Sequence, residues 1–398
     1  MAQLTATADD PAEPPPAPSS APARIGELLD GRWSVTGIRQ GGQGWVLIVD
    51  DHAQQVRRAI KVPMAGALIG DGELAMLLGI APHPHVIAAL DEVMVGDRCG
   101  VLLEYLPATL EDLLRQHHSA GPAQEFTSQA PPLNEGISLV LQHLCTGLAY
   151  LSDTTETAHL DLKPSNVLVD ESGRAKVADF GLAQAVRIQD GRFPTARGGT
   201  WAYAAPEVLR LDPCDARADV FSFGVLLYQA CTGLLPYPFE LAADSRTQRE
   251  QLLAYYASDR PGARTKELYY ATHPLAAEVP RWIPDTQLRI LLSMCLQEIP
   301  ENRPTSFSHL GGLLDRALGR PRPQAEPTVL TDDDRRHRQA TLARVLRRLG
   351  RLDESLDLLN ELLTQPLPGE LQSAVLQAAR DTLRAAGRHA DAAALEDY

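Results

Sequence analysis

The sequence HLDLKPSN, residues 159–166, places an Asp, a Lys and an Asn at steps of two and three residues, directly before an extended apolar run. Because this segment contains a proline, it favours a loop. The carboxylate of Asp161 and the amide of Asn166 can then turn toward one point. The turn sequence DESG follows and predicts a hairpin whose second strand ends at DFG, residues 179–181.

The hydrophobic pattern changes along the chain around this stretch. Upstream it favours strands, in RWSVTGIRQ (32–40), WVLIVDD (45–51), VRRAIKVP (56–63) and CGVLLEYL (99–106). From about residue 137 apolar residues recur three and four apart, as in ISLVLQHLCTGLAYL, which favours helices. We therefore predict an α+β fold in which a strand-rich lobe precedes a helix-rich lobe. Two lobes joined near residues 104–108 would leave a ligand site between them.

Two breaks divide the chain. Residues 1–23 are rich in Pro, Ala and Ser and are expected to form a disordered tail. Prolines and then charges interrupt the apolar pattern at 318–336, which predicts a linker. These breaks delimit a folded domain at 24–317 and a short helical segment at 337–398.

Charge and composition exclude some classes of function. The 398 residues are 44% hydrophobic and 22% charged, as expected of an ordinary globular protein. The formal net charge of -14 argues against a nucleic-acid-binding surface, which needs a basic face. The histidines show no metal-ligand spacing.

The cysteines and apolar segments indicate a cytoplasmic protein. The five cysteines are scattered and form no CxxC pair, which favours reduced thiols. The N-terminus has no apolar stretch of the kind that secretory signals carry. The most apolar run, VFSFGVLLYQACTGLLPY at 220–237, is short for a membrane span and is predicted to be a buried core helix.

Several residues fit the requirements of phosphoryl transfer from ATP, which needs metal ions, a cation and backbone donors around the phosphates. Three glycines in IRQGGQGWV, between two strands, could let backbone N–H groups approach phosphates, although a glycine-rich hairpin turn is as common. Lys61 in the next strand could reach the phosphates. Glu73, in a helical stretch, could hold Lys61; otherwise both are ordinary surface residues.

The opening loop supplies the remaining groups. Asp161 would accept the proton of an attacking hydroxyl, Lys163 would neutralise charge on the moving phosphoryl group, and Asn166 would bind Mg²⁺. Asp179, at a strand end, is a second hard oxygen ligand of the kind that Mg²⁺ prefers.

Over roughly residues 25–317, these residues resemble the eukaryotic-type serine/threonine protein kinases, in a bacterial-like form. The shared motifs are GGQGWV, AIK, Glu73, HLDLKPSN, DFG and AAPE. The resemblance implies the bilobal kinase fold, ATP with Mg²⁺, and transfer to Ser and Thr hydroxyls of proteins.

The resemblance also implies roles for individual residues. The ATP-binding set would be Ile38, Gly41, Gly42, Gly44, Val46, Ala59, Lys61, Glu73, Glu104 and Leu106. Thr200 matches a threonine that helps to position the catalytic Asp. Glu207 and Arg303 match an ion pair that ties the substrate-side segment to the helical lobe, and Asp219 matches the buried Asp that braces the catalytic loop.

The sequence departs from the family pattern at two positions. Arg39 replaces the first glycine of the loop, and we still expect the phosphate cradle to form. Leu160 replaces an Arg that in many relatives accepts an activation-loop phosphothreonine. We therefore hypothesise that activity depends little on phosphorylation of residues 182–204, where Thr195 is the plausible site.

The C-terminal segment contains two similar helical units. LARVLRRLGRLDESLDLLNELL (342–363) and LQAARDTLRAAGRHADAAALED (376–397) place apolar residues at helical spacing around Gly350 and Gly387. Their offset resembles the period of tetratricopeptide helix pairs, and a plain helical hairpin is the alternative. Two units are fewer than the roughly three needed for independent stability. We expect the segment to pack on the kinase-like domain or on another chain, and to dock a protein partner.

Two alternatives to an active protein kinase are a pseudokinase scaffold, which would bind partners through the helical tail, and a small-molecule phosphotransferase. Loss of a catalytic residue would favour the first, and absence of AAPE with its paired Arg would favour the second. The long segments 115–136 and 240–283 are docking surfaces or spacer loops.

Overall fold

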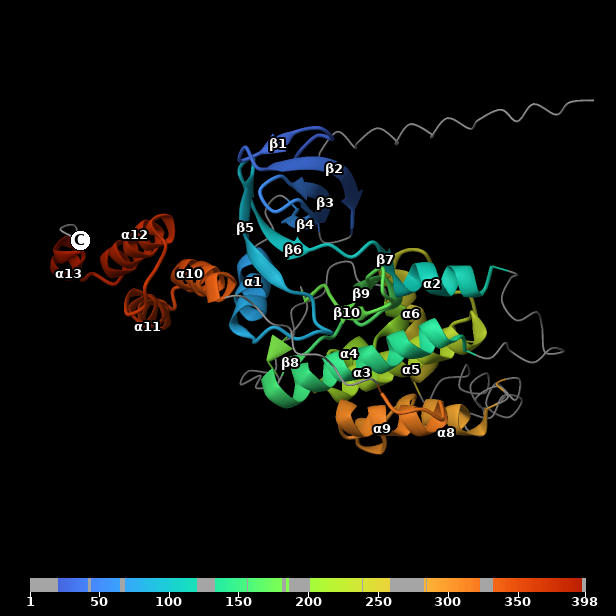
Figure 1. Cartoon of the computed structure of the whole chain (residues 1–398). Helices are drawn as coiled ribbons and strands as arrows, with labels where there is room; N and C mark the ends of the chain where they lie inside the picture. Colours follow the sequence, from blue (N-terminus) through green and yellow to red (C-terminus); the bar gives the residue numbers. More distant parts are fainter. Residues whose placement is uncertain are drawn as a thin grey trace, which may run out of the picture.

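The computed structural model describes residues 21–41, 44–64, 69–119, 133–155, 157–180, 184–185, 201–237, 239–257, 283, 285–322 and 332–395. Figure 1 shows a strand-rich lobe above a helical lobe, with the C-terminal helices to one side of the strand-rich lobe. The predicted α+β bilobal architecture is confirmed.

The strand-rich lobe contains a six-stranded antiparallel sheet with the order β1-β2-β3-β4-β6-β5. Its strands are β1 (Leu28–Leu29), β2 (Trp33–Gln40), β3 (Gly44–Asp51), β4 (Val56–Pro63), β5 (Ala89–Val95) and β6 (Arg98–Glu104). Alternate residues of β3 are fully buried, as period-two patterning requires. The four predicted strands are confirmed, whereas the sequence did not reveal β1 and β5.

The described residues begin at Ala21, inside the predicted tail. Ala21 and Ala23 pack against the apolar cluster of the sheet, which includes Leu29 and Trp33. Small apolar side chains of a Pro- and Ala-rich stretch can therefore pack against the core of the neighbouring sheet. Residues 1–20 lie outside the described residues.

Helix α1 (Ile69–Gly79) follows β4 and contacts both the sheet and helix α10 (Asp332–Arg348). After β6 the chain crosses to the helical lobe through β7 (Ala108–Thr109) and helix α2 (Leu110–His117). Thr109 and Asp112 form a capping box that starts α2.

Helices α3 and α5 form the centre of the helical lobe, and α8 and α9 pack beside them. The helices of this lobe are α3 (Glu135–Thr155), α4 (Pro206–Arg210), α5 (Arg217–Thr232), α6 (Ser245–Tyr256), α8 (Thr286–Cys295) and α9 (Phe307–Ala317). The short elements are β8 (Thr157–Ala158), β9 (Val167–Val169), β10 (Ala175–Val177), β11 (Gln184–Ala185) and three 3₁₀ turns, at Pro164–Asn166, Trp201–Tyr203 and Pro300–Asn302. The predicted hairpin is confirmed, because β9 and β10 pair antiparallel around Gly173.

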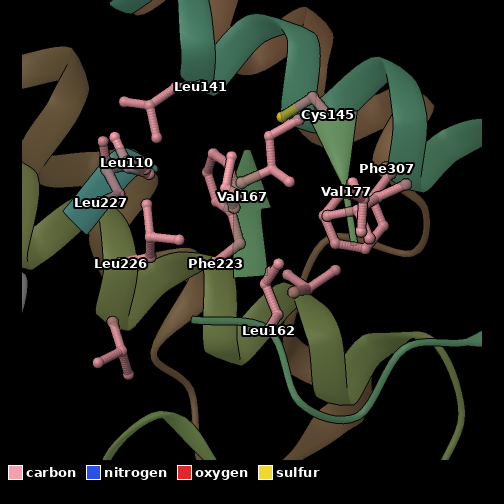
Figure 2. Packing of buried hydrophobic residues seen from close by; sticks show 14 of the residues in the cluster. Leu110, Leu141, Cys145, Leu162, Val167, Val177, Phe223, Leu226, Leu227 and Phe307 are labelled. Atoms are coloured by element: carbon pink, nitrogen blue, oxygen red, sulfur yellow. The ribbon is translucent and has the colours of Figure 1, made fainter. Parts of the chain in front are cut away.

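Helix α5 is the buried core helix that the sequence predicted. Figure 2 shows its residues Phe223, Leu226 and Leu227 packed among side chains from other elements of the lobe. A Cβ on Gly224 would lie 2.7 Å from the Cβ of Cys295, so only glycine lets α5 approach α8 this closely. Within the described ranges, no helix combines the length and apolar character needed to cross a membrane.

The C-terminal segment consists of α10, α11 (Leu352–Leu363), α12 (Gly369–Ala385) and α13 (His389–Ala394). The two predicted turns are confirmed: Gly350 has φ +76° and Gly387 has φ +74°, the left-handed geometry that favours glycine after a helix. In both turns the residue after the glycine donates its N–H to a carbonyl five residues back. The expectation that this segment packs on the kinase-like domain is also confirmed.

Helix α10 begins five residues before the predicted boundary at 337. The run of Asp and Arg residues at 332–336 looked like a linker because it lacks apolar residues. Acidic residues in a first helical turn are favourable, since they interact with the positive end of the helix dipole.

Candidate active site

The backbone of the HLDLKPSN loop is held by a buried carboxylate. Asp219, at the start of α5, accepts hydrogen bonds from the N–H groups of His159 (2.6 Å) and Leu160 (2.8 Å). These bonds fix Leu160 at φ +62°, a conformation that is uncommon for a residue with a side chain. Complete burial raises the pKa of the Asp219 carboxyl. The predicted bracing role of Asp219 is confirmed.

His159 connects this loop to the strand that ends in DFG. Its Nδ1 accepts the N–H of Asp161 at 3.2 Å, so its Nε2 carries the proton and donates to the carbonyl of Ala178 at 2.9 Å. The ring also lies 5.0 Å from that of Phe180, centroid to centroid. Both side chains are almost fully buried, so the loop and the strand end are held in a fixed relation.

Three polar side chains of the loop form one hydrogen-bonded group. Lys163 Nζ donates to Asp161 Oδ2 at 2.7 Å, and Asn166 Nδ2 donates to the same oxygen at 3.1 Å and to the Asp161 carbonyl at 2.8 Å. Among the described residues, nothing donates a hydrogen bond to Asn166 Oδ1. That oxygen is therefore the atom that could bind a cation.

The strand-rich lobe contributes a cation to the same place. Lys61, on β4, forms an ion pair of 2.7 Å with Asp179, which lies 118 residues later. Partial burial alone would raise the pKa of the Asp179 carboxyl. The nearby ammonium of Lys61 and the more distant one of Lys163 outweigh this and hold the pKa below its usual value. Asp179 therefore stays ionised at neutral pH.

The sheet register decides which of the predicted ATP-binding residues share a face with Lys61. Val46 lies directly opposite Lys61, and Ala59 lies two residues before it, so these three side chains lie on one face. Ile38 instead lies opposite Leu47 and packs against the core of the sheet. By register, Ile38 is on the other face.

The glycine-rich loop is described in part. The N–H of Gly41 donates to the carbonyl of Gly44 at 2.8 Å, which closes the hairpin. A Cβ on Gly44 would collide with the carbonyl oxygen of Val62, so the close approach of β3 to β4 requires glycine there. Gly42 lies outside the described residues.

The connection between the lobes is held by an ion pair that sequence reasoning missed. Lys176, on β10, donates to both carboxylate oxygens of Glu104 at 2.6 and 2.8 Å. The same carboxylate accepts the N–H of Ala88 at 2.8 Å. Leu106, two residues further on, is buried in the main core. A lysine in the middle of an apolar strand was the available signal for this contact.

Some predicted site residues cannot be placed. Thr200 and Thr195 lie outside the described residues, and so does the side chain of Glu73, whose backbone belongs to α1. Leu160 is half-buried and packs against the core of the helical lobe.

The predicted ion pair behind the AAPE motif is confirmed. Arg303 donates to both oxygens of Glu207 at 2.6 and 2.8 Å, and its side chain is fully buried. The same guanidinium also donates to the carbonyls of Arg217, Gln297 and Glu298. It thus joins α4 to the segment before α9.

Comparisons with known proteins agree with this geometry. A family model described as protein kinase domain matches residues 38–311, and one described as tetratrico peptide repeat matches 314–396. Serine/threonine-protein kinase 12 of Arabidopsis thaliana is 28% identical over 236 residues, which are 58% of this chain and 44% of that protein. Probable serine/threonine-protein kinase PBL7 of Arabidopsis thaliana is 30% identical over 299 residues, 71% of this chain and 75% of that protein.

A third relative, dual specificity protein kinase shkB of Dictyostelium discoideum, is 29% identical over 229 residues, 57% of this chain and 30% of that protein. The chain spans less than half the length of the first and third of these relatives. The first family model covers well over half of the chain. The chain therefore belongs to the protein kinase domain family, of the eukaryotic type, and carries a tetratricopeptide-like helical segment at its C-terminal end.

Proposed function

We propose that this protein is a serine/threonine protein kinase that transfers the γ-phosphoryl group of ATP to Ser and Thr hydroxyls of proteins. The proposal rests on two neighbouring groups of polar side chains. Asp161, Lys163 and Asn166 are hydrogen-bonded in one loop, and the ion pair of Lys61 with Asp179 lies beside them. All five side chains are present, which speaks against a pseudokinase scaffold. The buried Glu207–Arg303 pair speaks against a small-molecule phosphotransferase.

The residues present fit a nucleotide with Mg²⁺. Among the described side chains, no group of three or more His, Cys, Asp or Glu could hold a metal ion by itself. Mg²⁺ at nucleotide sites is typically held by one or two carboxylates together with the phosphates. Asp179, ionised because of Lys61, and Asn166 Oδ1 supply such a donor set. When bound, the ion would neutralise charge that develops on the phosphates.

The remaining steps belong to the protein's own side chains. Asp161 would accept the proton of the attacking hydroxyl, and its position is fixed by Asn166 and by the His159 ring. Lys163 would balance charge on the transferred group, and Thr200 would help to position Asp161. The nucleotide would be bound by Gly41, Gly42, Gly44, Val46, Ala59, Lys61, Glu73, Glu104 and Leu106. Ile38 belongs to the predicted set as well, but by register its side chain lies on the other face of the sheet from Lys61.

The test uses the full chain with labelled ATP, Mg²⁺ and a generic protein substrate. Wild-type protein should transfer label, and Asp161→Asn should reduce kcat by about 10²-fold or more because general-base catalysis is lost. Asp161→Asn should still bind nucleotide, which a fluorescent ATP analogue measures. Equal transfer by both proteins would remove Asp161 from the mechanism, and a wild type without transfer would refute the proposal.

We further propose the predicted division into a tail at 1–23, a kinase domain at 24–317, a linker at 318–336 and a helical segment at 337–398, with two boundaries adjusted. The domain includes Ala21 and Ala23, and the helical segment begins at Asp332. That segment would dock a protein partner, since tetratricopeptide repeats form such surfaces. The protein would reside in the cytoplasm. None of the five cysteines forms a disulfide in the described structure, which suits a reducing compartment. Burial raises the pKa of the Cys214 and Cys231 thiols to about 12, so both stay protonated at neutral pH.

A further inference from the structure

Helix α1, which carries Glu73, is a weak helix by sequence. Its 11 residues include Gly70, Gly72 and Gly79, and glycine is a poor helix former. Helices shorter than about 12 residues are marginal in water on their own. The last turn of α1 also lacks a basic residue to interact with its free carbonyl groups. The position of α1 is therefore set by the elements that pack against it.

One of these elements comes from the far end of the chain. Arg338, on α10, is buried and donates to the carbonyls of Leu77 (2.8 Å) and Ile80 (3.2 Å) at the C-terminal end of α1. It also donates to the carbonyl of Ala89, where β5 begins. A guanidinium placed on the last carbonyls of a helix satisfies them and interacts favourably with the helix dipole. Arg338 thus provides the cationic cap that α1 lacks.

Apolar packing strengthens this contact. Val345 of α10 is fully buried in the same apolar cluster as Leu74, Leu77 and Leu78 of α1. Leu342, one helical turn earlier, packs against that cluster. Figure 1 shows α10 lying directly beside α1, while α11, α12 and α13 lie farther out.

Polar contacts fix α10 to the neighbouring edge strand. Thr341 Oγ1 donates to Asp91 at 2.7 Å, and Arg344 and Arg348 contact Glu92 at 3.0 and 2.6 Å. The acidic residues of β5 therefore face basic residues of α10. This complementary charge fixes which face of α10 meets the strand-rich lobe.

Helix α1 also contacts β4, the strand that carries Lys61. We propose that Arg338 is a positioning residue for phosphoryl transfer: from the tetratricopeptide-like segment it holds helix α1, and through the contact of α1 with β4 it sets the geometry of Lys61. This proposal rests on the protein kinase activity proposed above. The C-terminal segment then contributes to catalysis, and a change in how it packs against α1 changes the rate of phosphoryl transfer. Because α1 acts on the nucleotide side, loss of Arg338 should alter kcat and the KM for ATP and leave the KM for protein substrate unchanged.

The experiment compares full-length variants at a temperature well below their melting temperatures. Arg338→Ala should lower kcat/KM for ATP about tenfold, since a buried charged hydrogen-bond donor is lost. Arg338→Lys should retain part of the activity. Arg351→Ala is the matched control, because Arg351 lies in the same segment and its side chain, among the described residues, pairs with Glu354 three positions later and not with the kinase domain. It should behave as wild type. If the wild type is inactive, the kinase proposal is refuted. If the wild type is active and Arg338→Ala is equally active, only the inference about Arg338 is refuted.

Two further variants separate positioning from folding. Gly72→Ala strengthens α1 itself, and its added Cβ would meet no atom within 4 Å. In the double variant, Gly72→Ala should restore part of the activity that Arg338→Ala loses. If the activity stays as low as in Arg338→Ala, Arg338 supports only the fold, and the proposal fails. Arg348→Glu places like charges at Glu92 and should lower kcat/KM for ATP in the same direction, although it leaves Arg338 in place. It provides the test if Arg338→Ala does not fold, and full activity would overturn the proposal.

Discussion

The two sides of the active site are supported in different ways. On the helical side, the loop of Asp161 and Asn166 is held by its own lobe, since buried Asp219 accepts the N–H groups of His159 and Leu160. The buried Glu207–Arg303 pair holds α4 in the same lobe. On the strand side, Lys61 lies on β4, which contacts a short glycine-containing helix, α1, whose end is capped from more than 250 residues away. The support of the helical side therefore comes from within its own lobe. The support of the strand side can be altered by a partner or a change that moves the C-terminal segment.

The largest loss of stability is expected when the buried Glu207–Arg303 pair of the helical side is broken. Arg303→Ala leaves the Glu207 carboxylate buried without its cation, which costs about 3–5 kcal/mol. Urea unfolding monitored by circular dichroism measures this. A loss below that of an exposed pair such as Arg246 with Glu250, tested by Arg246→Ala, would show that the helical side is not rigidly held.

Asp219→Asn should have the next largest effect. The N–H groups of His159 and Leu160 bond to different oxygens of Asp219, and an asparagine would place an NH₂ donor against one of them. The variant should therefore lose about 1–3 kcal/mol of unfolding free energy. Because the affected groups are those of His159 and Leu160, kcat should fall while the KM for ATP stays near wild type. A selective rise in the KM for ATP would contradict the division between the two sides.

Lys61→Met should make nucleotide binding sensitive to acid. Lys61 holds the pKa of Asp179 below its usual value of about 3.9, so the ion pair contributes stability above that pH and loses it as pH falls through the folded-state pKa. Without Lys61, the two largest influences that lower the pKa of Asp179 are lost, so this pKa rises. The acid limb of Mg²⁺-dependent binding of a fluorescent ATP analogue should therefore move to higher pH. An unmoved limb would show that Asp179 does not titrate with binding.

Gly72→Ala in the otherwise wild-type chain should stabilise α1 slightly, by about 0.5–1 kcal/mol, because alanine loses less backbone entropy on helix formation. Hydrogen exchange of the α1 amides should slow, and amides of α5 should be unaffected. Equal slowing in α5 would mean that the two sides of the site do not open independently.

The smallest effect is expected from Thr195→Ala, which should leave protein phosphorylation close to the wild-type rate. Leu160 packs against the core of the helical lobe and offers no cation to a phosphate. Kinase assays on protein purified with and without phosphatase treatment measure this. Collapse of activity in Thr195→Ala would reject the hypothesis of phosphorylation-independent activity.

Much of the fold was predictable because the hydrophobic pattern of each segment matches the secondary structure that the segment adopts in the fold. Long runs with period two or with helical spacing gave β2, β3, β4 and α5 the right type. Strand β5 was missed because Asp91 and Glu92 interrupt its apolar pattern. These residues belong to a strand because β6 pairs with them and because the arginines of α10 balance their charge.

The sequence by itself determined the chemical groups of the site, the order of the two lobes and the turns at Gly350 and Gly387, since residue type and spacing act over short stretches of chain. Tertiary structure alone decided that Lys61 meets Asp179, that Lys176 holds Glu104 and that Arg338 caps α1. These contacts join residues 72 to 261 positions apart, and such pairings arise only when packing of the two lobes and the C-terminal helices brings distant backbone into register.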